Sequence, residues 1–209
     1  MPVSQPGPPP RSQASLSSGQ VSEPGSPGSE TWPEDSDAWE RGGGPGWLTG
    51  TYDPELNTVY WGVGNAGPWN AAVRPGDNLY TGSMLALDPK TGGIKWHYQF
   101  TPNDPFDYDG TNELVMAELD GQKVVMQANR NGFFYVINRE TGKLIAANKF
   151  VERVDWADSI DLETGRPNET ELSAKIRSGE EVTFWPSACL LYTSPSPRDQ
   201  RGSRMPSSA

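Results

Sequence analysis

An all-β fold is predicted by three features of residues 31–188: short strand-like runs, turn signals between them and a repeated turn motif. Runs rich in β-branched and aromatic residues indicate strands at 58–64, 79–88, 94–100, 113–119, 123–129 and 133–138. Turn-forming sequences such as DPELN, RPGDN, DPKTGG and NRETGK separate these runs. Only residues 169–180 have a helical pattern, and it is weak.

The repeated turn motif indicates which all-β fold to expect. ALDPKTGGIKW (86–96) aligns with VINRETGKLIA (136–146), and the two Thr-Gly pairs are 50 residues apart. In the first copy, Asp88 can accept hydrogen bonds from turn amides, Gly92 can take a positive φ, and Trp96 offers a flat face for packing between sheets. The second copy keeps the turn but has Asn and Ala in place of Asp and Trp. A period of this length with about four strands per unit is typical of β-propeller blades.

Composition divides the chain into three zones. Residues 1–30 contain 19 Ser, Pro or Gly, which predicts a disordered, low-complexity segment, with non-native junction sequence as an alternative. Residues 31–188 carry the strand pattern and form the predicted propeller segment. Residues 189–209 are predicted to be a disordered tail, and CLLYTSPSPRD within them resembles the translation of a sequencing adapter. The adapter interpretation is favoured over a natural tail because the pattern stops abruptly after WPSA.

Charge and rare residues exclude several classes of function. The net charge of −10 disfavours nucleic acid and anionic membranes as partners. No run of about 18 apolar residues is present, so no membrane span is expected, and the start of the chain does not resemble a signal peptide. The single Cys189 excludes an internal disulfide. The single His97 disfavours a His-rich metal site and a Ser-His-Asp triad.

An acidic stretch, TPNDPFDYDG (101–110), lies between two predicted strands. It places Asp104, Asp107 and Asp109 within six positions of one another. Aspartate favours tight turns, and its carboxylate is also a ligand for hard cations. A sharp turn and a metal site both explain the cluster, and the composition of the stretch does not choose between them.

Several segments resemble one family in wording, order and spacing. The docking turn Ala86, Asp88, Thr91, Gly92 and Trp96 resembles the tryptophan-docking motif of the PQQ-dependent (quinoprotein) methanol and ethanol dehydrogenases. Segments 42–70, 74–78, 95–113 and 129–143 resemble successive segments of the same family. The resemblance implies a periplasmic, eight-bladed propeller that holds pyrroloquinoline quinone (PQQ) and a metal ion on its axis.

The length of the chain sets a further expectation. Eight repeats of this period need at least roughly 400 residues, so the central zone supplies about three to four blades. We therefore expect an internal fragment of a longer protein, inactive in isolation. The family's metal-binding glutamate, its vicinal cysteines and the later tryptophans of its substrate pocket are expected outside this chain.

Two residues are implied to contact the quinone. Trp47, in GGGPGW, matches the tryptophan that forms the floor under the ring, where a flat aromatic surface holds a planar cofactor by stacking. Pro45 departs from the hydroxyl residue common near this place in methanol dehydrogenases. Arg130, in NRNG, matches an arginine near the quinone oxygens. Without the resemblance, Trp47 is an ordinary buried tryptophan and Arg130 a surface residue of an Asn-Gly turn.

Three residues are implied to bind the metal. Asn65 matches the metal-binding asparagine, and Asp107 matches the catalytic aspartate, which acts as general base toward the alcohol. Asp109 occupies the position that carries an aspartate in the lanthanide-dependent branch and a small residue in the calcium-dependent one. A lanthanide is therefore favoured over Ca²⁺. The residues alone also allow turn roles for Asn65 and for Asp109 followed by glycine.

The implied function is oxidation of a small primary alcohol to an aldehyde, with hydride transfer to PQQ assisted by a Lewis-acid metal. The implied partners are a cytochrome c electron acceptor and, at full length, a second copy in a homodimer. The main alternative is a non-enzymatic propeller scaffold of the outer-membrane assembly lipoprotein type, which would have no reason to keep the candidate site residues together. A calcium-stabilised structural turn at 101–110 is a third, weaker possibility.

Overall fold

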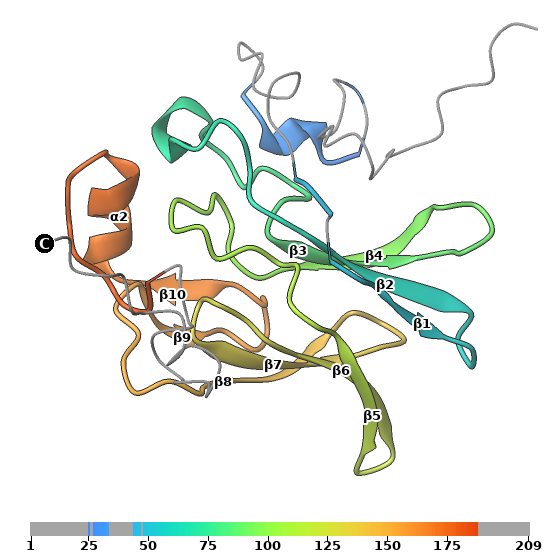
Figure 1. Cartoon of the computed structure of the whole chain (residues 1–209). Coiled ribbons are helices and arrows are strands. Elements are labelled where there is room, and N and C mark those ends of the chain that lie inside the picture. The colour runs from blue at the N-terminus through green and yellow to red at the C-terminus, as the bar shows by residue number, and fades with distance from the viewer. Residues whose placement is uncertain (1–24, 26, 34–43, 47, 188–209) are drawn as a thin grey trace, which may run out of the picture.

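The computed structural model describes residues 25, 27–33, 44–46 and 48–187 (Figure 1). The predicted tail at 189–209 and most of the predicted low-complexity segment lie outside these residues. A 3-10 helix, η1 (Ser29–Thr31), crosses the predicted boundary between residues 30 and 31. Just after this boundary, Trp32 is buried and donates from its indole N–H to Leu79 O over 2.7 Å. The division into three zones stays a prediction.

Strands dominate the described residues, which confirms the predicted all-β class. The first antiparallel sheet contains β1 (Thr51–Asp53), β2 (Thr58–Val63), β3 (Ser83–Leu87) and β4 (Ile94–Gln99), in that order. The second contains β5 (Val115–Leu119), β6 (Gln122–Ala128), β7 (Phe133–Asn138) and β8 (Leu144–Lys149). The remaining elements are η2 (Ala71–Val73), the hairpin β9 (Ala157–Ile160) and β10 (Pro167–Glu169), and α2 (Glu171–Arg177).

The described residues form two complete blades and a third, two-stranded sheet, fewer complete blades than the three to four predicted. Two long connections account for the difference. Residues 64–82 and 100–114 contain no strand, so the residues between β2 and β3 and between β4 and β5 add loops rather than blade strands. All six predicted strands overlap β2 to β7, and the predicted helix at 169–180 contains α2.

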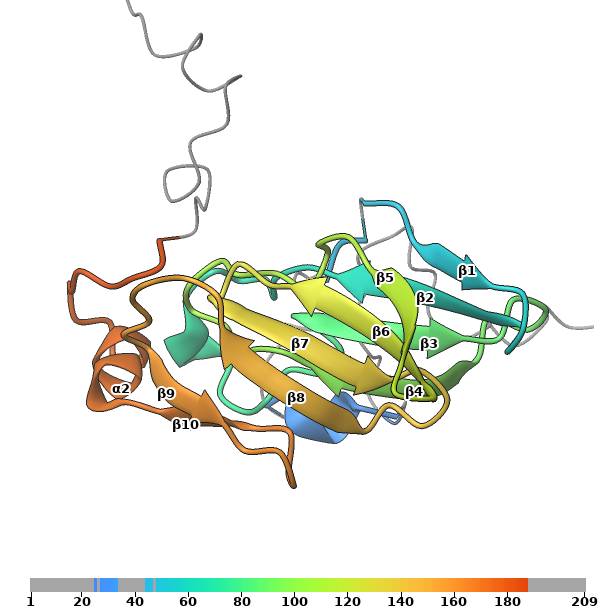
Figure 2. The same cartoon turned by 90° about the horizontal axis from the view of Figure 1, so that it is seen from below.

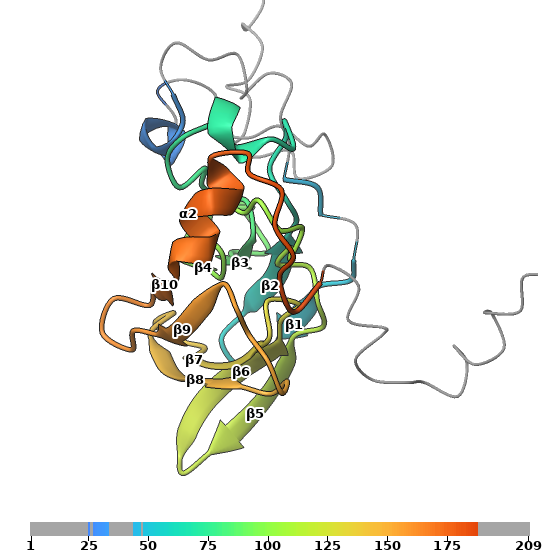
Figure 3. The ribbon, with the colours of Figure 1, turned by 90° about the vertical axis from the view of Figure 1, so that its left-hand side faces the viewer.

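The two blades pack face to face, as Figure 2 shows from below. Strand alternation provides the facing surfaces: β2 buries Thr58, Tyr60 and Gly62, and β7 buries Phe133, Tyr135 and Ile137. Tyr60, Phe133, Tyr135 and Ile137 join one apolar core that also includes Ala86, Tyr98, Phe100, Phe106, Tyr108, Val125 and Trp156. Figure 3 shows α2 beside β9 and β10 at one end of the molecule, where Ile176 packs against the same core.

The docking turn has the predicted geometry. Asp88 Oδ1 accepts hydrogen bonds from Lys90 N at 2.8 Å and Thr91 N at 2.9 Å, and Gly92 has φ +73°. The second copy makes the same bonds with Asn138 Oδ1, at 3.0 Å each, because an amide oxygen accepts as a carboxylate does. A third copy, which was not predicted, is centred on Asp161 in the β9–β10 hairpin.

Each turn after the first receives an aromatic ring from the first blade. A Cβ added at Gly142 would lie 2.8 Å from two ring atoms of Trp96. A Cβ added at Gly165, in the third turn, would lie 3.0 Å from the ring of Tyr98, whose hydroxyl donates to Gly165 O over 2.8 Å. The turns are therefore contacts between sheets as well as hairpin ends, because the missing Cβ lets the ring approach the backbone.

Gly142→Ala is expected to destabilise the fold by about 1–3 kcal/mol more than Gly92→Ala, because the new methyl group overlaps the Trp96 ring. Gly92 is a matched control: its φ of +73° is close to the +75° of Gly142, but an added Cβ there meets nothing within 4 Å. Backbone strain is thus the same in both variants. Equal changes in the free energy of unfolding, measured with denaturant, would contradict the inter-blade contact.

No helix among the described residues is long and apolar enough to cross a membrane.

Candidate functional site

The candidate residues are brought together at one end of the two blades. In the first sheet Val63 at the end of β2 pairs with Ser83, and Ser83 pairs with Gln99 at the end of β4, so the connections that follow β2 and β4 begin at the same end. Asn65 lies in the first connection and the acidic stretch in the second. The β6–β7 turn, which carries Arg130, reaches the same place, opposite the β1–β2 and β3–β4 hairpins (Figure 1).

Glycine backbone fixes the acidic stretch against the first sheet. A Cβ added at Gly62 would lie 2.3 Å from Gly110 O and 2.6 Å from Thr111 Cα. A Cβ added at Gly110 would lie 2.6 Å from Ser83 N and 2.8 Å from Val63 O. Backbone therefore packs directly on backbone where the acidic stretch crosses the ends of β2 and β3. This close contact fixes the position of the acidic stretch relative to the first sheet.

Asn65, Asp107 and Asp109 form one hydrogen-bonded group. Asn65 N donates to Asp109 Oδ1 over 2.9 Å, and Asp109 N donates to Asn65 Oδ1 over 3.1 Å. The side-chain amide of Asn65 also donates from Nδ2 to Asp107 Oδ1. Residues 42 and 44 positions apart in sequence thus share one site, as the family resemblance requires.

Arg130 joins the group through Asp109. Its Nη1 lies 2.8 Å from Asp109 Oδ2, and the Asp109 side chain is only 3% exposed whereas that of Arg130 is 36% exposed. Within the described residues Arg130 makes this one side-chain hydrogen bond, so its other N–H groups can bind an anionic group. The structure places Arg130 first as the counter-ion of Asp109.

Two buried amides hold the backbone that carries Asp109. Asn129 Nδ2 donates to Asp109 O over 3.0 Å and to Gln127 Oε1 over 2.9 Å. Gln127 Nε2 in turn donates to Gly110 O and Asn112 O. These bonds tie the acidic stretch to the second blade. Neither residue was predicted, because the sequence around a single Gln or Asn does not show that its side chain is buried.

The carboxylates of the site are electrostatically costly. Burial raises the pKa of Asp107, and it raises the pKa of Asp109 to about 6, with the Asp107 charge adding to that rise and the hydrogen bond from Asn65 N and the Arg130 charge opposing it. Both residues also have left-handed backbone, with φ of 67° and 60°. A cation placed between the two carboxylates would stabilise their ionised forms.

The donor set fits a hard cation. Asn65, Asp107 and Asp109 offer amide and carboxylate oxygens, the ligands that Ca²⁺-like ions prefer. This set has two carboxylates and one amide, and across the described residues no group of three or more His, Cys, Asp or Glu is arranged to hold a metal. Three residues cannot fill the six to eight positions of such an ion, and further ligands must come from elsewhere.

Trp47 lies outside the described residues, so its predicted position under the cofactor stays a prediction. The neighbouring residues 44–46 pack on β2 of the first blade. Pro45 O accepts a hydrogen bond from Gly64 N over 2.8 Å, and a Cβ added at Gly46 would lie 2.6 Å from the indole nitrogen of Trp61. The segment thus reaches the end of β2 that Asn65 follows.

A depression of about 600 Å³ lies elsewhere, between η2 and the segment from β10 to α2. Its charged lining residues are Asp77, Arg166, Glu169 and Arg177, and they form two internal ion pairs, Asp77 with Arg166 and Glu169 with Arg177. None of Asn65, Asp107, Asp109 and Arg130 lines it.

Stacked four-stranded antiparallel sheets, docking turns that receive rings from the neighbouring blade, and a polar site at one end define a segment of a quinoprotein-type β-propeller. The family model described as "PQQ: Glucose/ethanol/alcohol dehydrogenase, beta-propeller domain" matches residues 21–154. The chain belongs to this family.

Named relatives agree with this assignment. The chain is 48% identical over 157 residues to the quinoprotein alcohol dehydrogenase PedH of Pseudomonas putida, covering 73% of this chain and 26% of PedH. It is 40% identical over 156 residues to the putative dehydrogenase XoxF of Paracoccus denitrificans, covering 70% of this chain and 26% of the relative. The chain thus spans about a quarter of the length of the curated relatives it matches.

Solved structures agree as well. A europium-containing methanol dehydrogenase matches with a TM-score of 0.66 and 43% identity, covering 70% of this chain and 26% of that one. The quinohemoprotein alcohol dehydrogenase of Comamonas testosteroni matches with a TM-score of 0.67 and 43% identity, covering 74% of this chain and 23% of that one.

Proposed function

We propose that this chain is a segment of a PQQ-dependent alcohol dehydrogenase that oxidises a small primary alcohol to an aldehyde. The observation that supports this most is the hydrogen-bonded group of Asn65, Asp107, Asp109 and Arg130, in a chain 48% identical to a quinoprotein alcohol dehydrogenase. The whole protein carrying this segment, loaded with PQQ and La³⁺ or Ca²⁺, should reduce an artificial electron acceptor when a primary alcohol is added. Absence of turnover with either ion would contradict the proposal.

Asp107 is the proposed general base. Its Oδ1 accepts from Asn65 Nδ2, while its Oδ2 receives no hydrogen bond from the described residues. The free oxygen can accept the hydroxyl proton of the alcohol. Burial raises the pKa of Asp107, and a cation bound beside it would stabilise the ionised form that accepts the proton.

The proposed cofactor-binding residues are Trp47 and Arg130, and the proposed metal ligands are Asn65, Asp107 and Asp109. Bound PQQ would supply the hydride acceptor, and a bound lanthanide or Ca²⁺ would supply Lewis-acid polarisation. The unpaired N–H groups of Arg130 are suited to an anionic group of the cofactor, while its Nη1 holds Asp109 in place.

The location and partners of the whole protein belong to the same proposal: the periplasm, a cytochrome c electron acceptor and a homodimer. A non-enzymatic scaffold of the outer-membrane assembly type is the alternative. It would keep the docking turns but has no use for four converging site residues. A whole protein that folds but does not bind PQQ would favour the scaffold.

Asp109 is expected to set the choice of ion. A trivalent ion gains more from an additional carboxylate than a divalent one. Asp109→Ala should therefore weaken La³⁺ binding on the order of tenfold more than Ca²⁺ binding in the PQQ-loaded whole protein, as measured by competition between the two ions. Asp109 also pairs with Arg130, so Arg130→Gln is the matched control: it breaks the same ion pair and keeps the carboxylate. The same loss for both ions in Asp109→Ala would show that Asp109 does not set the choice of ion, and a loss equal to that of Arg130→Gln would show that Asp109 serves only Arg130.

A further inference from the structure

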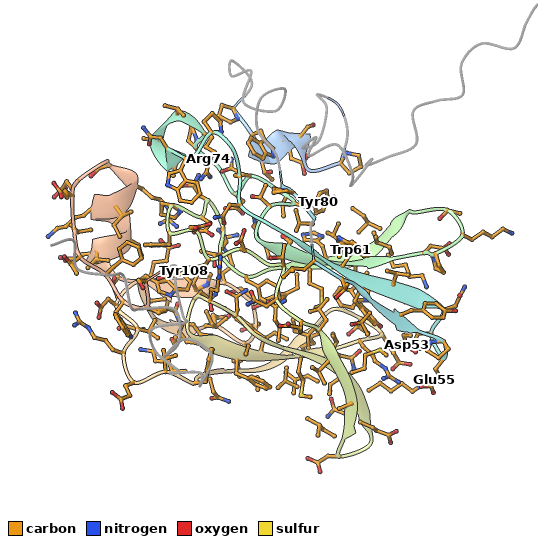
Figure 4. All side chains as sticks on the ribbon, in the orientation of Figure 1. Asp53, Glu55, Trp61, Arg74, Tyr80 and Tyr108 are labelled. Atoms are coloured by element: carbon orange, nitrogen blue, oxygen red, sulfur yellow. The ribbon has the colours of Figure 1, made fainter. Side chains whose placement is uncertain are left out.

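Arg74 is a buried cation that none of the proposed catalytic or binding roles uses. It is 1% exposed and lies in the loop after η2, where Figure 4 labels it. Its guanidinium donates from Nε to Pro68 O over 2.7 Å, from Nη2 to Trp69 O over 3.3 Å and from Nη2 to Asp104 O over 2.7 Å. Its Nη1 donates to Asn78 Oδ1 over 2.7 Å. Every branch of the side chain is therefore engaged.

Those acceptors belong to the two loops of the candidate site. Pro68 and Trp69 follow Asn65 in the first loop, and Asp104 precedes Asp107 in the second. The planar guanidinium has donors in a fixed fork, so it holds the carbonyls at set distances and angles. Arg74 thus ties the loop of Asn65 to the loop of the acidic stretch, although it touches neither candidate ligand carboxylate nor amide.

Asp104 extends this brace to the carboxylates. It is 2% exposed, its Oδ1 accepts from Phe106 N over 2.7 Å, and its Oδ2 accepts from Tyr108 N over 2.8 Å. Asp109 N lies 3.3 Å from the same Oδ2. These bonds shape the turn in which Asp107 and Asp109 take left-handed backbone, a conformation that is uncommon for non-glycine residues although aspartate and asparagine adopt it more often than others. The aspartate of the acidic stretch without a role in the sequence analysis therefore organises the turn.

We propose that Arg74, acting through Asp104, is a positioning residue that sets the spacing between Asn65 and the Asp107–Asp109 pair, and thereby the affinity of the site for its cation. The inference rests on the proposed metal site. An apolar core would stabilise these loops without the cost of desolvating a guanidinium. Apolar packing alone would not fix the spacing of the two loops, whereas a buried arginine with four hydrogen-bond acceptors does.

Arg74→Lys separates positioning from charge. Lysine keeps the positive charge and much of the volume, but its single ammonium cannot bridge the acceptors of a planar fork. We expect the affinity for Tb³⁺ to fall about 10–100-fold, the usual effect of losing a partner that orients metal ligands. Arg166→Lys is the matched control, because the side chain of Arg166 is 55% exposed and makes two hydrogen bonds to Asp77 but none to the candidate site residues. It should bind Tb³⁺ as the unmodified protein does.

The experiment titrates Tb³⁺ alone into the whole protein and follows luminescence sensitised by its aromatic residues, with thermal unfolding measured for each variant. Reduced affinity in a folded Arg74→Lys, with Arg166→Lys unchanged, supports the proposal. Unchanged affinity in a folded Arg74→Lys overturns it. No Tb³⁺ binding by the unmodified protein would overturn the metal site itself, and the inference with it.

Arg74→Lys could also prevent folding, and Asp104→Asn then provides the second test. This variant leaves the backbone acceptor of Arg74 in place but removes one carboxylate oxygen that organises the turn. A folded Asp104→Asn with reduced Tb³⁺ affinity supports positioning through the turn. A folded Asp104→Asn that binds Tb³⁺ as tightly as the unmodified protein overturns the proposal.

Discussion

Replacing Asp107 with Asn in the whole PQQ-loaded protein is expected to lower kcat for alcohol oxidation about 10²–10⁴-fold, the usual contribution of a positioned general base. The substitution preserves shape. Asn adopts left-handed backbone readily, so the φ of 67° at this position is tolerated, and its side-chain oxygen can still accept from Asn65 Nδ2. What is lost is the negative charge and the basic oxygen.

Asp120→Asn is the matched control for this measurement. Asp120 also has left-handed backbone, with φ of 50°, but it is exposed in the β5–β6 turn and is none of the proposed site residues. The kcat of the Asp120→Asn variant should equal that of the unmodified protein. Metal content must be measured in parallel, because Asp107 is also a proposed ligand. A metal-loaded Asp107→Asn with unchanged kcat would remove Asp107 from the role of base.

The sequence was sufficient to predict the parts of the fold that repeat. Runs rich in β-branched and aromatic residues located β2 to β7, and the Thr-Gly turn indicated sheets in contact, which the approach of Trp96 to Gly142 confirms. Strands β1, β8, β9 and β10 were not predicted; β1 and β10 have three residues each, and so short a run has no period to detect. The turn at Asp161 was missed because it lies 23 residues after the second copy, outside the 50-residue period.

The candidate site was predicted only in part. Family resemblance brought Asn65, Asp107, Asp109 and Arg130 to one place, and the structure places them in contact. The supporting residues Arg74 and Asp104 were not predicted. An arginine beside a Pro-Gly turn looks like a solvated surface residue, and only the three-dimensional course of two distant loops shows that it is buried. Local sequence cannot report a burial that residues 30 positions away create.

A second large effect is expected at the opposite end of the blades, where a buried ion pair joins them. Arg139, which follows β7, has its Nε 3.1 Å from Asp53 Oδ2, and the two side chains are 11% and 2% exposed. Neither atom has a hydrogen-bond partner among the residues that the structure describes, so the attraction is Coulombic. Arg139 also contacts the partly exposed Glu55 over 2.7 Å, and its backbone carbonyl accepts from the hydroxyl of Tyr60. Figure 4 shows Asp53 and Glu55 together at the end of the β1–β2 hairpin.

Arg139→Met is therefore expected to lower the free energy of unfolding by about 3–5 kcal/mol, because it leaves the Asp53 carboxylate buried without its counter-charge. In the native chain, Asp53 Oδ1 accepts hydrogen bonds from the backbone amides of Glu55 and Leu56. Asp53→Asn keeps a side-chain oxygen that can accept these bonds but removes the negative charge. The double variant should accordingly be more stable than Arg139→Met alone, since it no longer buries an unpaired charge.

The control for this cycle is Arg153→Met. Arg153 pairs with Asp155 over 2.7 Å, but its side chain is 68% exposed, so water replaces the lost partner and denaturant unfolding should not change measurably. The comparison isolates burial as the cause, because both substitutions remove an arginine from an ion pair with aspartate. If Arg139→Met and the double variant were equally destabilised, the loss would reflect packing of the arginine stem rather than the unpaired charge, and the two blades would not be joined electrostatically at this end.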